Sequence, residues 1–163
     1  KIIEQVRLAK QSVRNLNRFA HSVDAQHSRI EVAELLEFVV ALSARHAATA
    51  ETTLAISDSS APVAITMNPF FLEALIGRAI DIALARVGDT RRVVISVRAT
   101  EDGCRIAFEG LAGLTDPLEV FEAKQRVPAL LECLGARYRS DNDGTVLLLE
   151  IPDPERQAHG RTE

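Results

Sequence analysis

One predicted helix carries the side chains whose types and spacing are best suited to chemistry. Within residues 68–87, Glu73, Gly77 and Asp81 lie four residues apart and therefore form a narrow stripe on one helix face. A glycine inside a helix costs about 1 kcal/mol relative to alanine, so Gly77 needs an explanation. The stripe has two interpretations: a core helix that contains one unfavourable residue, or a helix that lines a ligand pocket.

The same segment has the signals of a well-defined helix. Asn68 is a favourable N-cap residue, and Pro69 suits the first helical position because its missing N–H costs nothing there. Apolar residues then follow the spacing of one buried helix face: Leu72, Leu75, Ile76, Ala79, Ile80, Ala83 and Val87. The polar stripe is therefore expected to lie beside a face that packs on the core.

Cysteine and histidine residues predict neither a metal site nor a disulfide. Cys104 and Cys133 lack metal-binding or disulfide spacing and are expected to be small buried residues in a reducing compartment. No set of histidine, cysteine and carboxylate residues has the spacing of metal ligands. The four histidines are expected to be exposed structural residues: His21, His27, His46 and His159.

The central helix and its neighbours resemble the ATP-binding catalytic domain of bacterial sensor histidine kinases, a GHKL-type ATPase. In that family an aspartate–proline pair begins a helix of the pattern L-x-Q-V-L-x-N-L-L-x-N-A. Asn68 and Pro69 are similar to this start. The two asparagines of the pattern are assigned to Gly77 and Asp81. The apolar frame of the pattern is matched by Leu75, Ile76, Ala79 and Ile80.

The resemblance implies how an ATP pocket would be built. In the family, an asparagine on the central helix holds Mg²⁺, a D-x-G-x-G loop reads the adenine, and a G-x-G pair opens a helix that receives the phosphates. On this chain the Mg²⁺ position falls on Asp81. The adenine loop keeps only an acid, Glu109, and Gly113, and the phosphate glycines fall on Phe121 and Ala123.

These replacements predict a domain that keeps the shape of a kinase and has lost its catalysis. Aspartate can bind Mg²⁺ but adds a negative charge beside a triphosphate, so no cofactor is expected, and ATP and Mg²⁺ would bind only if the pocket still functions. The first hypothesis is therefore a degenerate kinase-like module of two-component signalling, or pseudokinase. It would dimerise and dock the receiver domain of a response regulator or another signalling protein.

Three alternatives stay open at this point. The first is a divergent but active histidine kinase that uses Asp81 for Mg²⁺ and Glu109 for adenine. The second is a histidine phosphotransferase, part of a phosphorelay, whose phosphorylated histidine lies upstream of Lys1. The third is an α+β domain of unrelated function, because a fold does not fix a function.

The first residues of the chain predict a separate dimerisation helix, residues 1–27. Its apolar residues alternate in spacing between four and three, which is the a/d seam of a coiled coil or helical bundle: Ile2, Val6, Ala9, Val13, Leu16 and Ala20. A surface helix packed on its own domain is the alternative. The resemblance implies the second helix of a dimerisation hairpin, whose first helix would precede Lys1. A homodimer is therefore expected.

The remaining pattern predicts a two-layer α+β sandwich, the histidine kinase-like ATPase fold, over residues 28–152. Helices are expected at residues 30–48, 68–87 and 118–135, all on one face of a mixed sheet. The six expected strands of that sheet are residues 52–57, 63–67, 91–99, 104–108, 136–140 and 145–151. The polar tail, residues 153–163, is expected to be disordered.

Composition limits the possible partners. Hydrophobic residues make up 47% and charged residues 26% of the chain, and the net charge of −4 argues against a nucleic-acid partner. No apolar run approaches the roughly 18 residues that a membrane helix needs, so no membrane contact is expected within this chain. A cytoplasmic location in a bacterium is expected.

Overall fold

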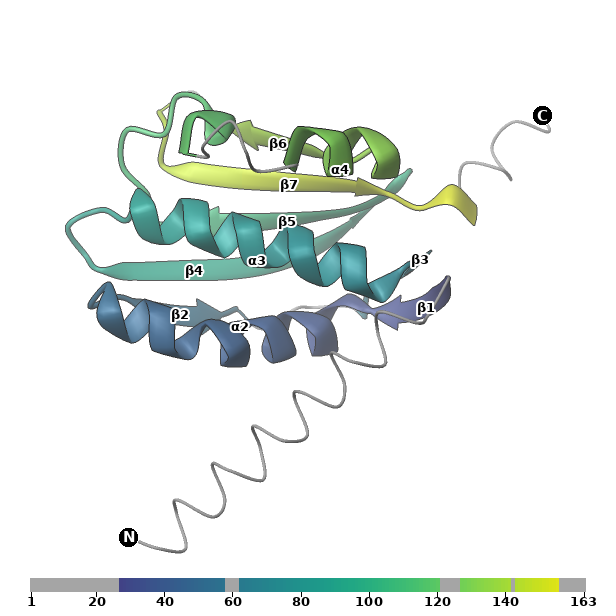
Figure 1. Ribbon diagram of the computed structural model, residues 1–163, viewed down its shortest axis with the longest axis horizontal. Helices are drawn as coiled ribbons and strands as arrows, with labels where there is room; N and C mark the ends of the chain where they lie inside the picture. The colour runs from purple at the N-terminus through teal and green to yellow at the C-terminus, as the bar shows by residue number, and fades with distance from the viewer. Residues whose placement is uncertain (1–26, 58–61, 121–126, 142, 156–163) are drawn as a thin grey trace, which may run out of the picture.

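A layer of helices covers one face of a β-sheet in this protein (Figure 1). The structure, a computed structural model, describes residues 27–57, 62–120, 127–141 and 143–155. The predicted dimerisation helix and its seam, Phe121 and Ala123 lie outside the described residues. The three covering helices are α2 (Val32–Thr49), α3 (Pro69–Ala85) and α4 (Val127–Leu134). The predicted two-layer α+β fold is confirmed.

The main sheet has five strands in the order β2-β4-β5-β7-β6. Strands β2 and β4 run parallel, and the other neighbouring pairs run antiparallel. Because parallel strands need a long crossover connection, the chain between β2 and β4 includes α3, which packs on the sheet. The strands are β2 (Thr53–Ile56), β4 (Arg92–Thr100), β5 (Gly103–Glu109), β6 (Arg137–Ser140) and β7 (Val146–Pro152).

A second sheet of two strands corrects one prediction. Strand β1 (Ser28–Glu31) pairs antiparallel with β3 (Ala64–Met67). The prediction that all six strands share one sheet is therefore wrong for β3, because periodicity identifies a strand but not the strand that supplies its backbone hydrogen bonds. The predicted helix start at Ile30 is also wrong. Ile30 pairs with Ile65 in this sheet, and α2 begins at Val32.

Helix α3 begins as predicted and supplies much of the core. The Asn68 side chain accepts hydrogen bonds from the amides of Phe70 at 2.9 Å and Phe71 at 3.4 Å, which confirms the N-cap. Burying a leucine or isoleucine side chain contributes about 1.5–3 kcal/mol. The buried apolar residues of α3 are Leu72, Leu75, Ile76, Ala79, Ile80, Ile82, Ala83 and Leu84.

Alternation along the strands divides the sheet into two faces. Every second residue of β4, β5 and β7 is buried against the helices: Val93, Ile95, Val97, Cys104, Ile106, Phe108, Leu147, Leu149 and Ile151. The residues between them lie on the opposite face. Among the described elements, the helices all lie on one side of the sheet, so we call the other side the open face (Figure 1).

The prediction that both cysteines are buried holds for one of them. Cys104 is buried, but Cys133 is exposed, so the prediction that both are buried is wrong. Helix α4 is short and buries only Val127 and Leu131, which leaves Cys133 off its buried face. Asp153, at the start of the predicted tail, is buried. None of the helices that the structure describes is both long and apolar enough to cross a membrane.

Candidate functional site

A groove between α2 and α3 contains the polar stripe of the central helix. Its volume is about 310 Å³. The groove brings Glu73, Gly77 and Asp81 together along α3, opposite residues of α2. Its full lining is Val39, Leu42 and Ser43 from α2, and Phe70, Glu73, Ala74, Gly77, Arg78 and Asp81 from α3. Arg78 and Asp81 lie near one another, the buried Glu73 lies about two helical turns away along α3, and most of the remaining wall is apolar.

Both carboxylate oxygens of Asp81 already have partners. Its Oδ2 accepts a hydrogen bond from Nη1 of Arg78 at 3.0 Å, and its Oδ1 lies 3.3 Å from Nδ1 of His46. The Asp81 side chain is 34% exposed, so these contacts lie at the rim of the groove. A Mg²⁺ ion at Asp81 would have to displace one or both partners. His46 was expected to be a structural residue, and only the folded chain reveals its contact with Asp81.

Gly77 leaves open space in the wall of this groove. A Cβ atom built on Gly77 would meet no heavy atom within 4 Å outside its own helix backbone. Close packing therefore does not require glycine here. Leu42, on the α2 side, is 43% exposed, which is high for a large apolar side chain. The groove is thus largely apolar, with the buried Glu73 in its wall and the charged pair Arg78 and Asp81 at its rim.

Residues 110–114, which overlap the predicted adenine loop at residues 109–113, are closed onto the protein. The Leu111 amide donates to the Thr145 carbonyl at 3.0 Å, and the Ala112 amide donates to the Arg86 carbonyl at 2.7 Å. Leu111 is only 4% exposed and Leu114 only 1% exposed. The leucines of this segment therefore form part of the core, and its backbone joins the end of α3 to the turn before β7.

The glycines of this segment have backbone conformations that favour glycine. Gly110 has a φ of +97°, and a Cβ atom there would lie 2.2 Å from the Arg92 carbonyl oxygen. Gly113 has a φ of +64°, which favours glycine. Glu109 alternates with the buried Phe108 and lies on the open face. The structure therefore separates Glu109 from the groove that contains Asp81.

A second alignment of the family pattern fits the apolar pairs of α3 more closely. Matched residue for residue, the two asparagines then fall on Arg78 and Ile82, one position after Gly77 and Asp81. Ile82 is fully buried, with 0% exposure, and Arg78 is paired with Asp81. Neither alignment places an asparagine on this helix. Among the described residues, no group of three or more histidine, cysteine, aspartate or glutamate residues could hold a metal.

Tyr138 makes a contact with the central helix that the sequence did not indicate. It lies on β6, and its hydroxyl donates a hydrogen bond to the backbone carbonyl of Leu75 in α3. Burial raises the pKa of Tyr138 well above its ordinary value. The charge of Arg78 lowers this pKa and the charge of Asp81 raises it, both by less than burial does. The hydroxyl thus fixes the edge of the sheet to the middle of the central helix.

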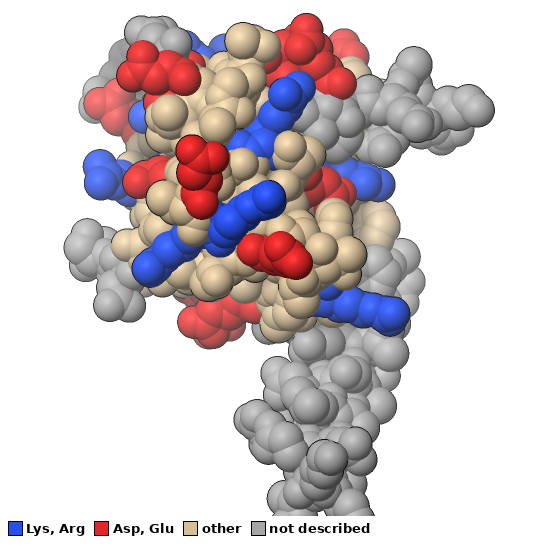
Figure 2. All heavy atoms as spheres, turned by 90° about the vertical axis from the view of Figure 1, so that its left-hand side faces the viewer, with Lys and Arg blue, Asp and Glu red and all other residues tan. Residues whose placement is uncertain are grey.

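The end of the molecule where α3 ends carries charges of both signs. Figure 2 views the left-hand side of Figure 1, where α3 ends and β4 begins. Lysine and arginine side chains lie between aspartate and glutamate side chains on this face. Among the described residues visible there, no broad region has a single sign of charge.

The fold is that of histidine kinase catalytic domains. The catalytic domain of histidine kinase ThkA matches with a TM-score of 0.61 and 13% identity, over 79% of this chain and 98% of that chain. The ATP-binding domain of PrrB from Mycobacterium tuberculosis matches with a TM-score of 0.60 and 21% identity, over 80% and 99%. Histidine kinase AdeS from Acinetobacter baumannii matches with a TM-score of 0.60 and 15% identity, over 93% and 82%.

At the level of sequence, no protein-family model and no curated protein matches the chain. The structural likeness at these low identities establishes the fold and leaves the activity to be argued from the site.

Proposed function

We propose that this chain is a histidine kinase-like module of two-component signalling that does not turn over ATP. It acts by forming a homodimer and by docking a response regulator or another signalling protein. The fold is that of kinase catalytic domains. We infer that the chain has kept this fold and that the residues that would hold a nucleotide have been replaced.

The main support for this proposal is the closed conformation of residues 110–114. In the histidine kinase family that the sequence resembles, the glycines of this loop let its backbone pass close to the adenine. Here Leu111 and Leu114 are buried, and their amides donate to the carbonyls of Thr145 and Gly144 at 3.0 and 3.1 Å. Opening a base site would expose two leucines, and each costs about 1.5–3 kcal/mol to transfer to water.

The state of Asp81 supports the same conclusion. Its carboxylate is paired with Arg78 and His46, and no asparagine occupies the helix in either alignment. Hydrogen bonds to charged groups contribute about 1.5–3 kcal/mol each, and a micromolar site has only about 8 kcal/mol in total. The loss of two such contacts would weaken Mg·ATP binding to the millimolar range.

The surfaces of the helix layer support a docking role. The groove between α2 and α3 exposes Leu42 and leaves the space beside Gly77 unfilled. Exposed apolar surface with a polar rim is typical of protein contacts. The predicted seam of residues 1–27 would supply the dimer, as the sequence pattern indicates.

An ATP hydrolysis assay tests the proposed loss of turnover. The full chain, incubated with ATP and Mg²⁺ in a phosphate-release assay, is expected to give the same rate as buffer alone. The matched control is Asp81→Ala, which should leave that background unchanged. Hydrolysis that requires Mg²⁺ and disappears in Asp81→Ala would instead identify a divergent active kinase.

A further inference from the structure

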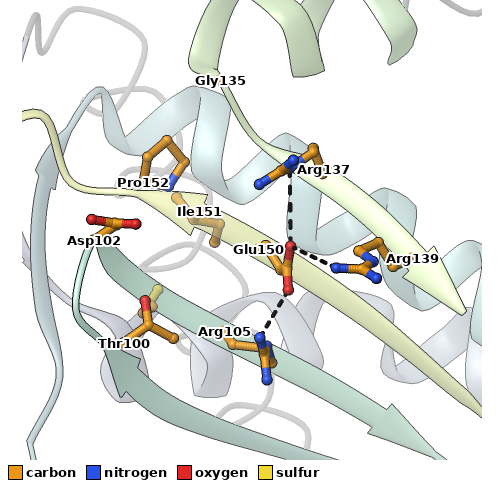
Figure 3. Close-up of a pocket in the computed structure, with 10 residues that line it drawn as sticks. Thr100, Asp102, Arg105, Gly135, Arg137, Arg139, Glu150, Ile151 and Pro152 are labelled. Atoms are coloured by element: carbon orange, nitrogen blue, oxygen red, sulfur yellow. Dashed lines mark hydrogen bonds and ion pairs between the residues drawn. The ribbon is translucent and has the colours of Figure 1, made fainter. Parts of the chain in front are cut away.

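Three arginines surround one carboxylate on the open face of the main sheet (Figure 3). Nη2 of Arg105 lies 2.9 Å from Oε1 of Glu150. Nε of Arg137 and Nη1 of Arg139 each lie 3.9 Å from its Oε2. We call Arg105, Arg137 and Arg139 the arginine cluster. It draws its members from β5 and β6, on either side of β7.

Strand register explains why these side chains meet. Glu150 on β7 lies directly opposite Arg105 on β5 and Arg137 on β6. Arg139 is two residues beyond Arg137 and therefore lies on the same face of β6. Arg98 on β4 is opposite Arg105 and adds a fourth arginine to this row. The fold thus gathers positive charge on a chain whose net charge is −4.

The contacts with Glu150 do not occupy the cluster. Only Arg105 lies within hydrogen-bond distance of the carboxylate, because 3.9 Å is too long for a hydrogen bond. Within the described ranges, the side chains of Arg137 and Arg139 donate no hydrogen bond to protein. They are 76% and 63% exposed, whereas the Glu150 side chain is 18% exposed. Two forked guanidinium groups therefore present donors to solvent.

A hollow of about 330 Å³ lies beside the cluster. Its other lining residues include Thr100, Gly135 and Pro152, together with one further acid, Asp102. Figure 3 shows Asp102 beside Pro152, on the opposite side of the hollow from the arginines. Counting the lining charges, three arginines against Glu150 and Asp102 leave one positive charge. The hollow has the size of a small-ligand site.

A purely structural role does not explain this arrangement. Exposed ion pairs contribute little to stability, and one arginine is enough to pair Glu150. Arginine is suited to bidentate recognition of phosphate and carboxylate groups, because its planar fork presents parallel donors. Exposed donors beside a hollow therefore favour binding of an anion.

We propose that the arginine cluster binds a small oxyanion with two or more negative charges, either a phosphate monoester or a compact polycarboxylate. The anion lies in the hollow and is held by the forks of Arg137 and Arg139. Glu150 holds Arg105 in place and also competes with the anion for the cluster. This site lies on the opposite side of the sheet from the groove, and the proposal does not depend on the proposed function.

Titration of the full chain followed by NMR tests the proposal. Inorganic phosphate and citrate are the two probes, added separately at low ionic strength. At least one is expected to shift the amide and guanidinium signals of the cluster with saturation, and to bind more weakly as salt rises. Saturation by phosphate alone assigns the site to phosphate monoesters, and saturation by citrate alone assigns it to polycarboxylates.

Three variants provide the comparison. The double variant Arg137→Gln, Arg139→Gln is expected to lose affinity by about tenfold or more. Glu150→Gln is expected to gain affinity by about threefold or more, because it removes a competing charge. Arg45→Gln, an exposed arginine on α2, lowers the net charge by one, against two for the double variant, and should match the wild type in affinity. The proposal is overturned if neither probe saturates, if a folded double variant keeps wild-type affinity, or if Glu150→Gln weakens binding.

Discussion

At the scale of single residues, Tyr138 is a sensitive reporter of how the two layers are joined. Its hydroxyl donates to the Leu75 carbonyl, and burial raises its pKa above the ordinary value of about 10. A folded pKa above the unfolded pKa means that the folded state keeps its proton longer. The corresponding stability is present below about pH 10 and is lost as the pH rises above it.

Alkaline titration of tyrosinate absorbance measures this directly, because the chain contains one tyrosine and no tryptophan. We expect Tyr138 to stay protonated above pH 10 and to ionise only when the protein unfolds. Tyr138→Phe should cost about 1 kcal/mol of unfolding free energy at pH 7 and should reduce the loss of stability at alkaline pH. Reversible ionisation near pH 10 in protein that stays folded would show that the hydroxyl is not buried.

At the scale of elements, a side chain can be added at Gly77 in α3 but not at Gly110 in the loop after β5. Gly77 lies inside α3 and has open space beside it, whereas Gly110 has a positive φ and lies against the Arg92 carbonyl. We expect Gly77→Ala to raise the free energy of unfolding by about 0.5–1 kcal/mol. Gly110→Ala should lower it by about 2 kcal/mol or more, because it combines strain with a clash.

Urea unfolding of both variants checks this pair, with the wild type as reference. A destabilised Gly77→Ala protein would mean that the groove is filled rather than open. A Gly110→Ala protein as stable as the wild type would mean that segment 110–114 is not held in the closed conformation described above.

Periodicity in the sequence predicts where the helices and strands lie along the chain better than it predicts which strands pair with one another. The buried stripe of α3 and its cap at Asn68 are local signals, so this helix could be located from the sequence. The pairing of β3 with β1 depends on contacts between distant segments, so periodicity placed β3 in the wrong sheet.

The candidate site shows the same limit. Glu73, Gly77 and Asp81 share a groove because they lie on one helix face. The contact between His46 and Asp81 and the arrangement of the arginine cluster require the order of the elements in space. Arg137 and Arg139 do alternate within β6, a sign that they share a face, but nothing local shows that Glu150 lies beside them.

At the scale of the whole molecule, the chain shares its fold with histidine kinase catalytic domains at 13–21% identity. Buried side chains of α3 and of the main sheet pack together in the core. We propose that the segments that would reach a nucleotide are altered. The surfaces left for interaction are the groove between α2 and α3, the open face, and the predicted seam of residues 1–27.

Dimer formation is predicted from the seam alone, since it lies outside the described residues. The full chain is expected to run as a dimer in light scattering, and Val13→Glu should shift it toward monomer by burying a charge in the seam. Gln11→Glu adds the same charge at an outer position and should leave the dimer intact. A monomeric wild type at high concentration, or a Val13→Glu dimer as tight as the wild type, would remove this part of the account.

Titration calorimetry with ATP and Mg²⁺ tests the proposed loss of nucleotide binding. The comparison uses the wild type, Asp81→Ala, and the Arg137→Gln, Arg139→Gln double variant, which should weaken the proposed anion binding on the open face. We expect no saturable heat that requires Mg²⁺ up to millimolar ATP, and any residual heat should decrease in the double variant. Micromolar binding that requires Mg²⁺, persists in the double variant and is lost in Asp81→Ala would contradict the account.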